Sequence, residues 1–309
     1  HNKYSAFFNF IFFIRYLFVI FFISLIFFFT IPKFFNYEKR EDIFNNYLSN
    51  NFDLKINKYE KIDFYVFPIP NIQIKNVEIK LDQISSDLYS SNISIYPKIL
   101  SIYNHDNFQG KKIILHKAEL KLKTSESIDF IKNVLNQKKN FSFKNLNLEV
   151  SNNDKNLINI KNVNFSNYGY SKNIFSGKIF DQKFKLKLNE NMTDILFKIP
   201  DIKLQAYFNL KNTTEKLIAG NSKIRILDTN LKFNFIYSNK KFEILNTHFR
   251  NKDLSFKGKS IITFVPYFDS NSSIVIEDIN LKILKGIDFI KLLKSKNIIK
   301  KINSKNKII

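Results

Sequence analysis

The sequence predicts a mainly β protein that begins with a transmembrane helix. Uncharged, mostly apolar residues run without a break over residues 16–31. Beyond residue 50 the chain mostly alternates apolar side chains with Lys, Asn, Ser and Asp, which is the period-two pattern of strands with one apolar and one wet face. Gly and Pro occur only 6 times each, so Asn and Ser are expected at the turns. We expect one long, largely antiparallel sheet with a few short helices.

The apolar N-terminal segment is typical of a membrane anchor. Residues 16–31 would form a helix of about 24 Å, and apolar neighbours extend it toward the roughly 30 Å hydrocarbon core. A cleaved signal peptide is the alternative, but residues 30–34 offer no small-x-small cleavage site. We expect an uncleaved anchor over residues 1–36, with a cytoplasmic N-terminus because a large following domain translocates largely regardless of charge. Its expected defining residues are Arg15, Tyr16, Leu17, Phe29 and Ile31.

Short helices are expected at three further places. Apolar spacing predicts an amphipathic helix over residues 38–50, ended by a left-handed cap at Asn50-Asn51. A strand-then-helix pattern then occurs twice, at residues 120–132 and 281–291, and both copies contain Ile-Asp-Phe-Ile-Lys. Such self-similarity indicates a repeated architecture. The chain ends near Ile309, about where a strand like FSFKNLNL is expected to follow, so either a further unit is missing or the protein is a short one.

Four strand-like segments shift the phase of their alternation by one residue: IQIKNVEI (72–79), FSFKNLNL (141–148), INIKNVNF (158–165) and IVIEDINL (274–281). In an undisturbed strand Val77 would face away from Ile74. A β-bulge at Lys75-Asn76 would restore the shared face, and so would a two-residue hairpin turn. We favour the bulge because neither Lys-Asn nor Glu-Asp supplies the Gly that tight hairpins prefer. The alternative is a chance echo in a chain rich in Ile, Lys and Asn.

The motifs give no indication of an enzyme. Without Cys, neither a disulfide nor thiolate chemistry is possible. No two His residues are three or four positions apart, which disfavours a metal site. His116 has the alternation parity of Leu120, which points it toward the apolar face as a structural residue. Gly177-Lys178 lacks the first glycine of a phosphate loop, and no G-x-S-x-G run occurs. We expect no catalytic residue, no metal and no cofactor.

The net charge of +22 suggests an anionic partner, either nucleic acid or a phospholipid surface. Part of this charge is discounted because AT-rich codons favour Lys, Asn, Ile and Phe. Nucleic acid is disfavoured because the Lys residues are spread along many strands and the anchor directs the domain outward. The basic tail, residues 291–307, is expected to be solvated or to lie on a membrane surface.

Three segments carry a resemblance to a known family. They are YEKREDIFNNYLSNNFDLKI (37–56), FYVFPIPNIQIKNVEIK (64–80) and a strand, short helix and slipped strand over residues 113–150. In this layout the chain resembles the AsmA-like proteins of double-membraned bacteria, in which an anchor and a short helix lead into a strand, a Pro-x-Pro-like corner and an apolar-x-apolar-x-Asn-Val run. The chain departs from the family in having Asn-Asn where a Gly usually follows the first helix, and in being short.

The resemblance implies an inner-membrane anchor followed by a periplasmic β-groove domain over residues 37–309, in which a long curled sheet has a hydrophobic concave face. It implies phospholipid as the ligand, outer-membrane or envelope proteins as partners, and passive sliding of phospholipid between the two membranes in support of outer-membrane biogenesis. Bulges would bend the strands while keeping the groove face apolar. The expected groove residues are Ile72, Ile74, Val77, Ile79, Leu120, Leu122, Phe141, Phe143, Leu146, Leu148, Ile158, Ile160, Val163 and Phe165.

Two alternatives remain open at this point. The same apolar faces would form an ordinary sandwich core if they closed on each other. The domain would be a non-enzymatic envelope scaffold or assembly regulator if its exposed faces contacted other proteins. If the domain is a lipid trough, charged substitutions at the concave positions should abolish function. If it is a scaffold, substitutions on the exposed faces should do so instead.

Overall fold

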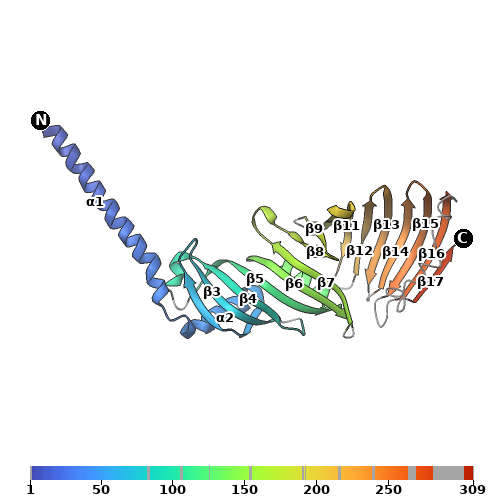
Figure 1. Cartoon of the computed structure of the whole chain (residues 1–309), viewed down its shortest axis with the longest axis horizontal. Helices are drawn as coiled ribbons and strands as arrows, with labels where there is room; N and C mark the ends of the chain where they lie inside the picture. The colour runs from blue at the N-terminus through green and yellow to red at the C-terminus, as the bar shows by residue number, and fades with distance from the viewer. Residues whose placement is uncertain are drawn as a thin grey trace. The chain divides into compact units, whose positions relative to one another are not determined.

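The computed structural model describes residues 2–81, 84–104, 107–124, 126–152, 155–189, 191, 193–214, 217–238, 241–263, 269–280 and 303–308. The chain divides into two compact units, unit 1 (His1–Lys172) and unit 2 (Asn173–Ile309), although no break in composition marks Lys172. Both units consist mainly of β-strands, as predicted, and short connections join most consecutive strands (Figure 1).

Unit 1 contains the N-terminal helix and the first seven strands of the sheet. Its α-helices are α1 (Asn2–Thr30), α2 (Glu41–Phe52) and α3 (Ser127–Leu135), with 3-10 turns at Ile31–Phe34, Glu38–Arg40, Ile99–Ile102 and Gly169–Ser171. Its strands are β1 (Leu54–Lys58), β2 (Lys61–Tyr65), β3 (Asn71–Leu81), β4 (Leu88–Pro97), β5 (Gly110–Lys123), β6 (Asn140–Asn152) and β7 (Lys155–Ser166). Neighbouring strands pair antiparallel, except that β5 and β6 run parallel and are joined through α3. A parallel pair needs such a crossover connection.

Unit 2 contains the remaining strands of the same long, largely antiparallel sheet, so the prediction of one long sheet is confirmed. Its strands are β8 (Ile174–Ile179), β9 (Gln182–Leu188), β10 (Asp194–Ile199), β11 (Leu204–Thr213), β12 (Leu217–Ile226), β13 (Thr229–Ser238), β14 (Lys241–Arg250), β15 (Leu254–Thr263), β16 (Asp269–Ile279) and β17 (Asn303–Ile308), with a 3-10 turn at Pro200–Ile202. Each strand from β8 to β16 pairs antiparallel with the next. Among the described residues of this unit there is no α-helix.

The structure describes the first copy of the predicted repeat and two parallel strand pairs, β5 with β6 and β16 with β17. The first copy forms the end of β5 followed by α3, and β6 then pairs parallel with β5. After the second copy, β17 pairs parallel with β16. The second predicted helix, at residues 287–293, lies outside the described residues.

The phase shifts are bulges, and the hairpin alternative is wrong. Strands β3, β6 and β7 each run through their shift without a turn, and Asn76, Asn145 and Asn162 adopt left-handed φ angles of 48°, 60° and 54°. Asn tolerates this conformation better than most residues because its short polar side chain bonds locally. In β16 the register against β15 slips at Glu277, since Ser255 pairs with Asp278 and Phe256 with Ile276.

The bulges of unit 1 are aligned across neighbouring strands. Between β5 and β6 the pairing is interrupted after His116 and Lys144 and resumes at Glu119 and Asn147. Lys117 of β5 also has a positive φ, at 47°. Aligned bulges bend adjacent strands at the same level, which creases and curls the sheet.

Substitutions of Asn145 test whether the bulge in β6 needs a residue that tolerates a positive φ. The Asn145 side chain is exposed, so a substitution changes the conformational preference more than the packing. Asn145→Val is expected to lower the free energy of unfolding by about 1–2 kcal/mol, because a β-branched residue is strained in the left-handed region. Asn145→Gly should leave stability nearly unchanged. Urea unfolding of both variants measures the difference, and equal stability of the two would contradict the bulge.

Helix α2 extends two residues beyond its predicted end. The left-handed cap is Asp53, with φ of 55°, and not Asn50-Asn51. The continuation carries Phe52 into the core of unit 1, where its ring lies 6.1 Å from the ring of Phe141. Local cap preference at the Asn pair is therefore overridden by burial of a large aromatic side chain.

Helix α1 has the length and composition of a membrane span. The 25-residue segment Phe10–Phe34 has a mean hydropathy of 2.6, and most of its side chains are exposed, although Pro32 near its end is buried. Arg15, Tyr16 and Leu17 are exposed near its start, whereas Phe29 is half-buried and Ile31 exposed near its end. The segment is long enough to cross the hydrocarbon core of a bilayer.

Candidate functional site

The apolar faces of the strands in unit 1 and in unit 2 are the candidate site. In unit 1, cross-strand pairing lines up one row from β2 to β7, and the bulges keep the residues beyond the crease on the same face. The members of this row are Ile62, Ile74, Ile93, Leu115, Phe143 and Phe165.

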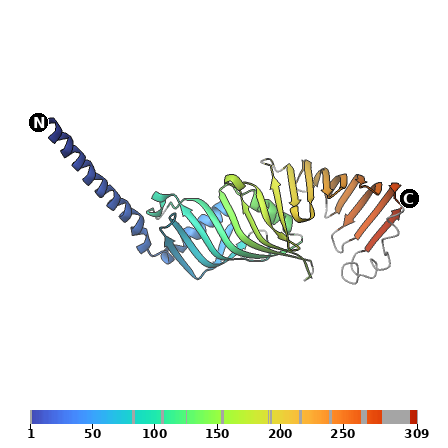
Figure 2. The same ribbon diagram turned by 45° about the horizontal axis from the view of Figure 1, so that its top comes forward.

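Helices α2 and α3 cover this face of unit 1. Figure 2 shows both helices against the sheet. Leu48 and Phe52 of α2 are fully buried, and Phe130 of α3 packs on Phe143 with ring centroids 6.1 Å apart. Gln137, just after α3, donates from Nε2 to the carbonyl oxygen of Phe52 at 3.0 Å. The two helices thus form one packed layer on the sheet.

The structure brings the predicted groove residues together on this face, but mostly in a closed core. Most of them are at most 3% exposed: Ile72, Ile74, Val77, Ile79, Leu120, Leu122, Phe141, Phe143, Leu146, Val163 and Phe165. The half-buried remainder is Leu148, Ile158 and Ile160. A fully buried side chain has no surface left for an acyl chain. The sandwich alternative is thus partly right for unit 1, since the apolar face closes, but it closes on helices and not on a second sheet.

Unit 2 carries an apolar face of a different kind. Cross-strand pairing aligns one apolar residue on every strand from β8 to β16, and we call this set the unit 2 apolar row. Its members are Phe175, Leu186, Phe197, Ala206, Ile224, Leu231, Phe249, Phe256 and Ile276. All are half-buried except Ala206, which is buried. Phe249 and Phe256 stack with ring centroids 4.6 Å apart.

A second row beside it widens the apolar surface of unit 2. Leu188, Ile195, Phe208, Ser222 and Phe233 are aligned on the same face by the same pairings. Within the part of unit 2 that the structure describes, no α-helix is present to cover this face. In this second row Leu188, Ser222 and Phe233 are buried, whereas Ile195 and Phe208 are half-buried. The outer surfaces of the half-buried side chains on this face remain accessible.

The opposite face of unit 2 is polar and basic. Residues next in sequence to members of the row point the other way because strand side chains alternate. These residues are Lys187, Lys198, Lys223, Lys232, His248 and Lys257. The unit 2 apolar row itself carries no charge, and these basic side chains lie on the other face.

The unit 2 row was not among the predicted groove residues. The sequence does show its alternation, for example in Phe184 to Leu188 and in Leu231 to Phe235. Alternation alone does not reveal register between strands, so the continuity of the row cannot be read from it. One feature of the sequence could have indicated an uncovered face. No amphipathic helical segment that would cover the face occurs between the strands from β8 to β16.

His116 lies on the opposite face from the one its parity predicts. The bulge at Lys117 reverses the alternation, so Ala118 is buried on the apolar side while His116 is half-buried on the other. There Ser94 Oγ lies 3.3 Å from His116 Nε2. Burial, with a smaller contribution from Lys144, lowers the pKa of His116. The parity prediction was wrong because this bulge lacks the Lys-Asn signature of the others.

Comparisons with family models, with curated proteins and with solved structures give no match for this chain. The class that can be stated from the fold is a β-sheet protein with an N-terminal helix of membrane-spanning length.

Proposed function

We propose that the chain is a membrane-anchored, non-enzymatic lipid-transfer protein, in which phospholipid tails slide along the apolar face of unit 2. By the AsmA-like resemblance we place the anchor in a bacterial inner membrane and the sheet in the periplasm. The lipid then moves toward the outer membrane, with other envelope proteins setting its direction.

The single observation that carries the proposal is the continuity of the unit 2 apolar row. Eight inter-strand steps of about 4.8 Å from β8 to β16 make it roughly 38 Å long. One leaflet of a roughly 30 Å hydrocarbon core holds tails of about 15 Å. The row is therefore longer than one lipid tail, as sliding requires, and not only as large as a single binding pocket.

The chemistry of the face suits an acyl chain with a wet headgroup. Each buried CH₂ contributes about 0.8 kcal/mol, and the row presents side chains of Phe, Leu and Ile for that contact. No carboxylate or ammonium group occurs among its members, so a tail meets no fixed charge along its length. The headgroup stays in water outside the sheet.

A vesicle assay tests this function. The full chain is reconstituted into donor vesicles with fluorescent phospholipid, and transfer to protein-free acceptor vesicles is followed. We expect transfer above the protein-free rate, in proportion to the amount of protein. A reconstituted, folded chain that gives only the protein-free rate would contradict the proposal and favour the envelope scaffold.

A further inference from the structure

Five large apolar side chains are exposed beside the end of α1, outside the helix itself. Phe34, Phe67 and Leu100 are 85%, 84% and 77% exposed, and Ile69 and Ile99 are 54% and 38% exposed. We call these five residues the apolar edge. Soluble surfaces rarely gather so many large apolar tips in short connections, and such a group marks a contact surface.

Strand pairing places the loop members of the apolar edge at one end of the unit 1 sheet. Tyr65 pairs with Asn71, so the loop that holds Phe67 and Ile69 leaves the sheet at the β2–β3 end. Because Ile72 pairs with Ile95, β4 also ends at this level. The 3-10 turn Ile99–Ile102 follows directly. Both loops therefore project from the same end.

Specific contacts hold this end of the sheet against the end of α1. The hydroxyl of Tyr103 donates to the carbonyl oxygen of Phe28, and the two rings lie 5.1 Å apart. Phe35 packs edge-on against Tyr103 at 5.7 Å. In Figures 1 and 2 the segment around residue 100 lies beside the C-terminal end of α1.

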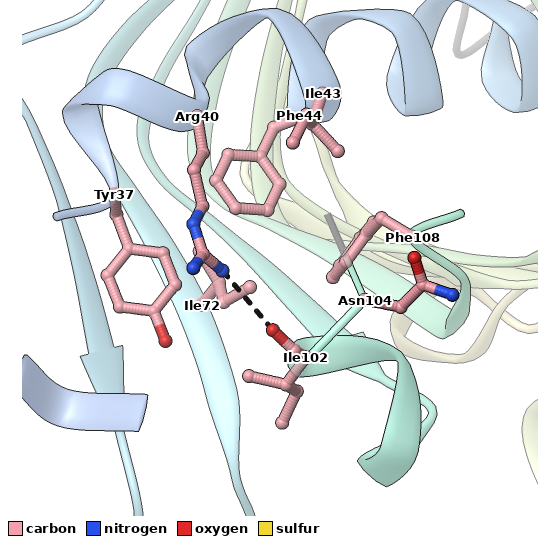
Figure 3. A pocket seen from close by; sticks show the side chains of 8 residues that line it. All are labelled: Tyr37, Arg40, Ile43, Phe44, Ile72, Ile102, Asn104 and Phe108. Carbon is pink, nitrogen blue, oxygen red and sulfur yellow. Dashed lines mark hydrogen bonds between the residues drawn. The ribbon is translucent and has the colours of Figure 1, made fainter. Parts of the chain in front are cut away.

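Arg40 and Tyr37 complete the junction, as Figure 3 shows. Arg40 Nη1 donates to the carbonyl oxygen of Ile102 at 3.2 Å, and its guanidinium lies 4.5 Å from the ring centre of Phe35. The Tyr37 hydroxyl donates to the carbonyl oxygen of Pro32 at 2.7 Å. Burial raises the pKa of Tyr37, so it remains a donor. The junction fixes the depth of the loops relative to α1.

The occupant of the apolar edge follows from its continuity with the membrane span. The apolar span ends at Phe34, which itself belongs to the edge. Side chains held at the level of the last turn of a membrane helix lie at the boundary between headgroups and tails. Exposed Lys33, Lys39 and Lys98 accompany them, and cations beside apolar tips suit an anionic bilayer surface.

We propose that Phe67, Ile69, Ile99 and Leu100 insert beside α1 into the headgroup–tail boundary of the same bilayer. This second, monotopic contact fixes the sheet's first strands on the membrane surface. The proposal depends on α1 crossing a membrane and does not depend on lipid sliding in unit 2. A chain that transfers no lipid would still show this contact.

The chain has no Trp, so single Trp residues report membrane insertion without background. Phe67→Trp and Leu100→Trp are made separately in the full chain and reconstituted into phosphatidylcholine–phosphatidylglycerol vesicles with or without bromine at tail carbons near the headgroup. Both are expected to emit at shorter wavelength and to be quenched at least about twofold, because interfacial segments bury roughly 5–10 Å deep. The control is Leu157→Trp, which is 52% exposed at the opposite end of the unit 1 strands and should not be quenched.

Quenching at both positions is required. If Phe67→Trp and Leu100→Trp are no more quenched than Leu157→Trp, or if only one of them is, the proposal is overturned. The edge would then face water or a protein partner. Loss of the blue shift in Phe67→Trp on adding Leu100→Asp, with α1 still inserted, would show that the two loops act as one surface. An unchanged shift would contradict a shared surface.

Discussion

Leu231→Lys is expected to slow lipid transfer by the full chain about 30- to 150-fold. Leu231 lies in the middle of the unit 2 apolar row, between Ile224 and Phe249 on the adjoining strands. A sliding tail must pass every strand, so one ammonium group in its path adds a desolvation cost of about 2–3 kcal/mol to the barrier, and each 1.36 kcal/mol is tenfold in rate. The fluorescent transfer assay measures the effect.

Asn230→Lys is the matched control, since it adds the same charge one residue away on the opposite, exposed face. We expect its transfer rate to equal that of the unchanged chain, and both variants to show the circular dichroism of a folded sheet. Equal slowing by the two variants would mean that net charge, and not the apolar row, governs transfer.

Phe52→Ala is expected to lower the free energy of unfolding of unit 1 by about 3–5 kcal/mol, because it leaves a cavity where a fully buried ring was. Phe52 contacts both Phe141 of the sheet and Tyr47 of its own helix, so its loss frees α2 from the apolar face. Chemical denaturation followed by the far-ultraviolet signal measures the change. Ile131→Ala, at a 47% exposed position of α3, should stay within about 0.5 kcal/mol.

The size of the Phe52 effect separates a closed face from an open one in unit 1. If Phe52→Ala cost no more than Ile131→Ala, α2 would not be packed on the sheet in solution. The apolar face of unit 1 would then be accessible, and the residues from Ile72 to Phe165 that the sequence suggests as groove positions would regain that role.

The bulges show what the sequence can predict well. A one-residue shift between Ile74 and Val77 has few physical solutions when both side chains are buried on one face, and the absence of Gly selects among them. The helix α2 was predictable for the same reason, from apolar spacing. Its docking site was not, because Phe52 meets Phe141 across a long stretch of chain and no local pattern specifies such a partner.

The sequence predicts that the candidate site is an apolar face of a sheet, but it does not predict which residues of that face are accessible. Alternation shows that a strand has an apolar face, but whether a helix covers that face depends on tertiary packing. The predicted groove residues lie together on the apolar face of unit 1, beneath the helices that cover it. The accessible row in unit 2 requires the register of every strand pair from β8 to β16, and His116 shows that a single bulge without a signature inverts a parity argument.

Site-specific photocross-linking tests the central claim most directly. A benzophenone amino acid is placed at Phe249, in the unit 2 apolar row, or at neighbouring His248 on the exposed opposite face, in the full chain within native membranes. After irradiation, mass spectrometry of the purified chain identifies adducts. The account predicts phospholipid adducts at position 249 and none at position 248. Adducts of protein alone, or equal lipid labelling at both positions, would contradict it.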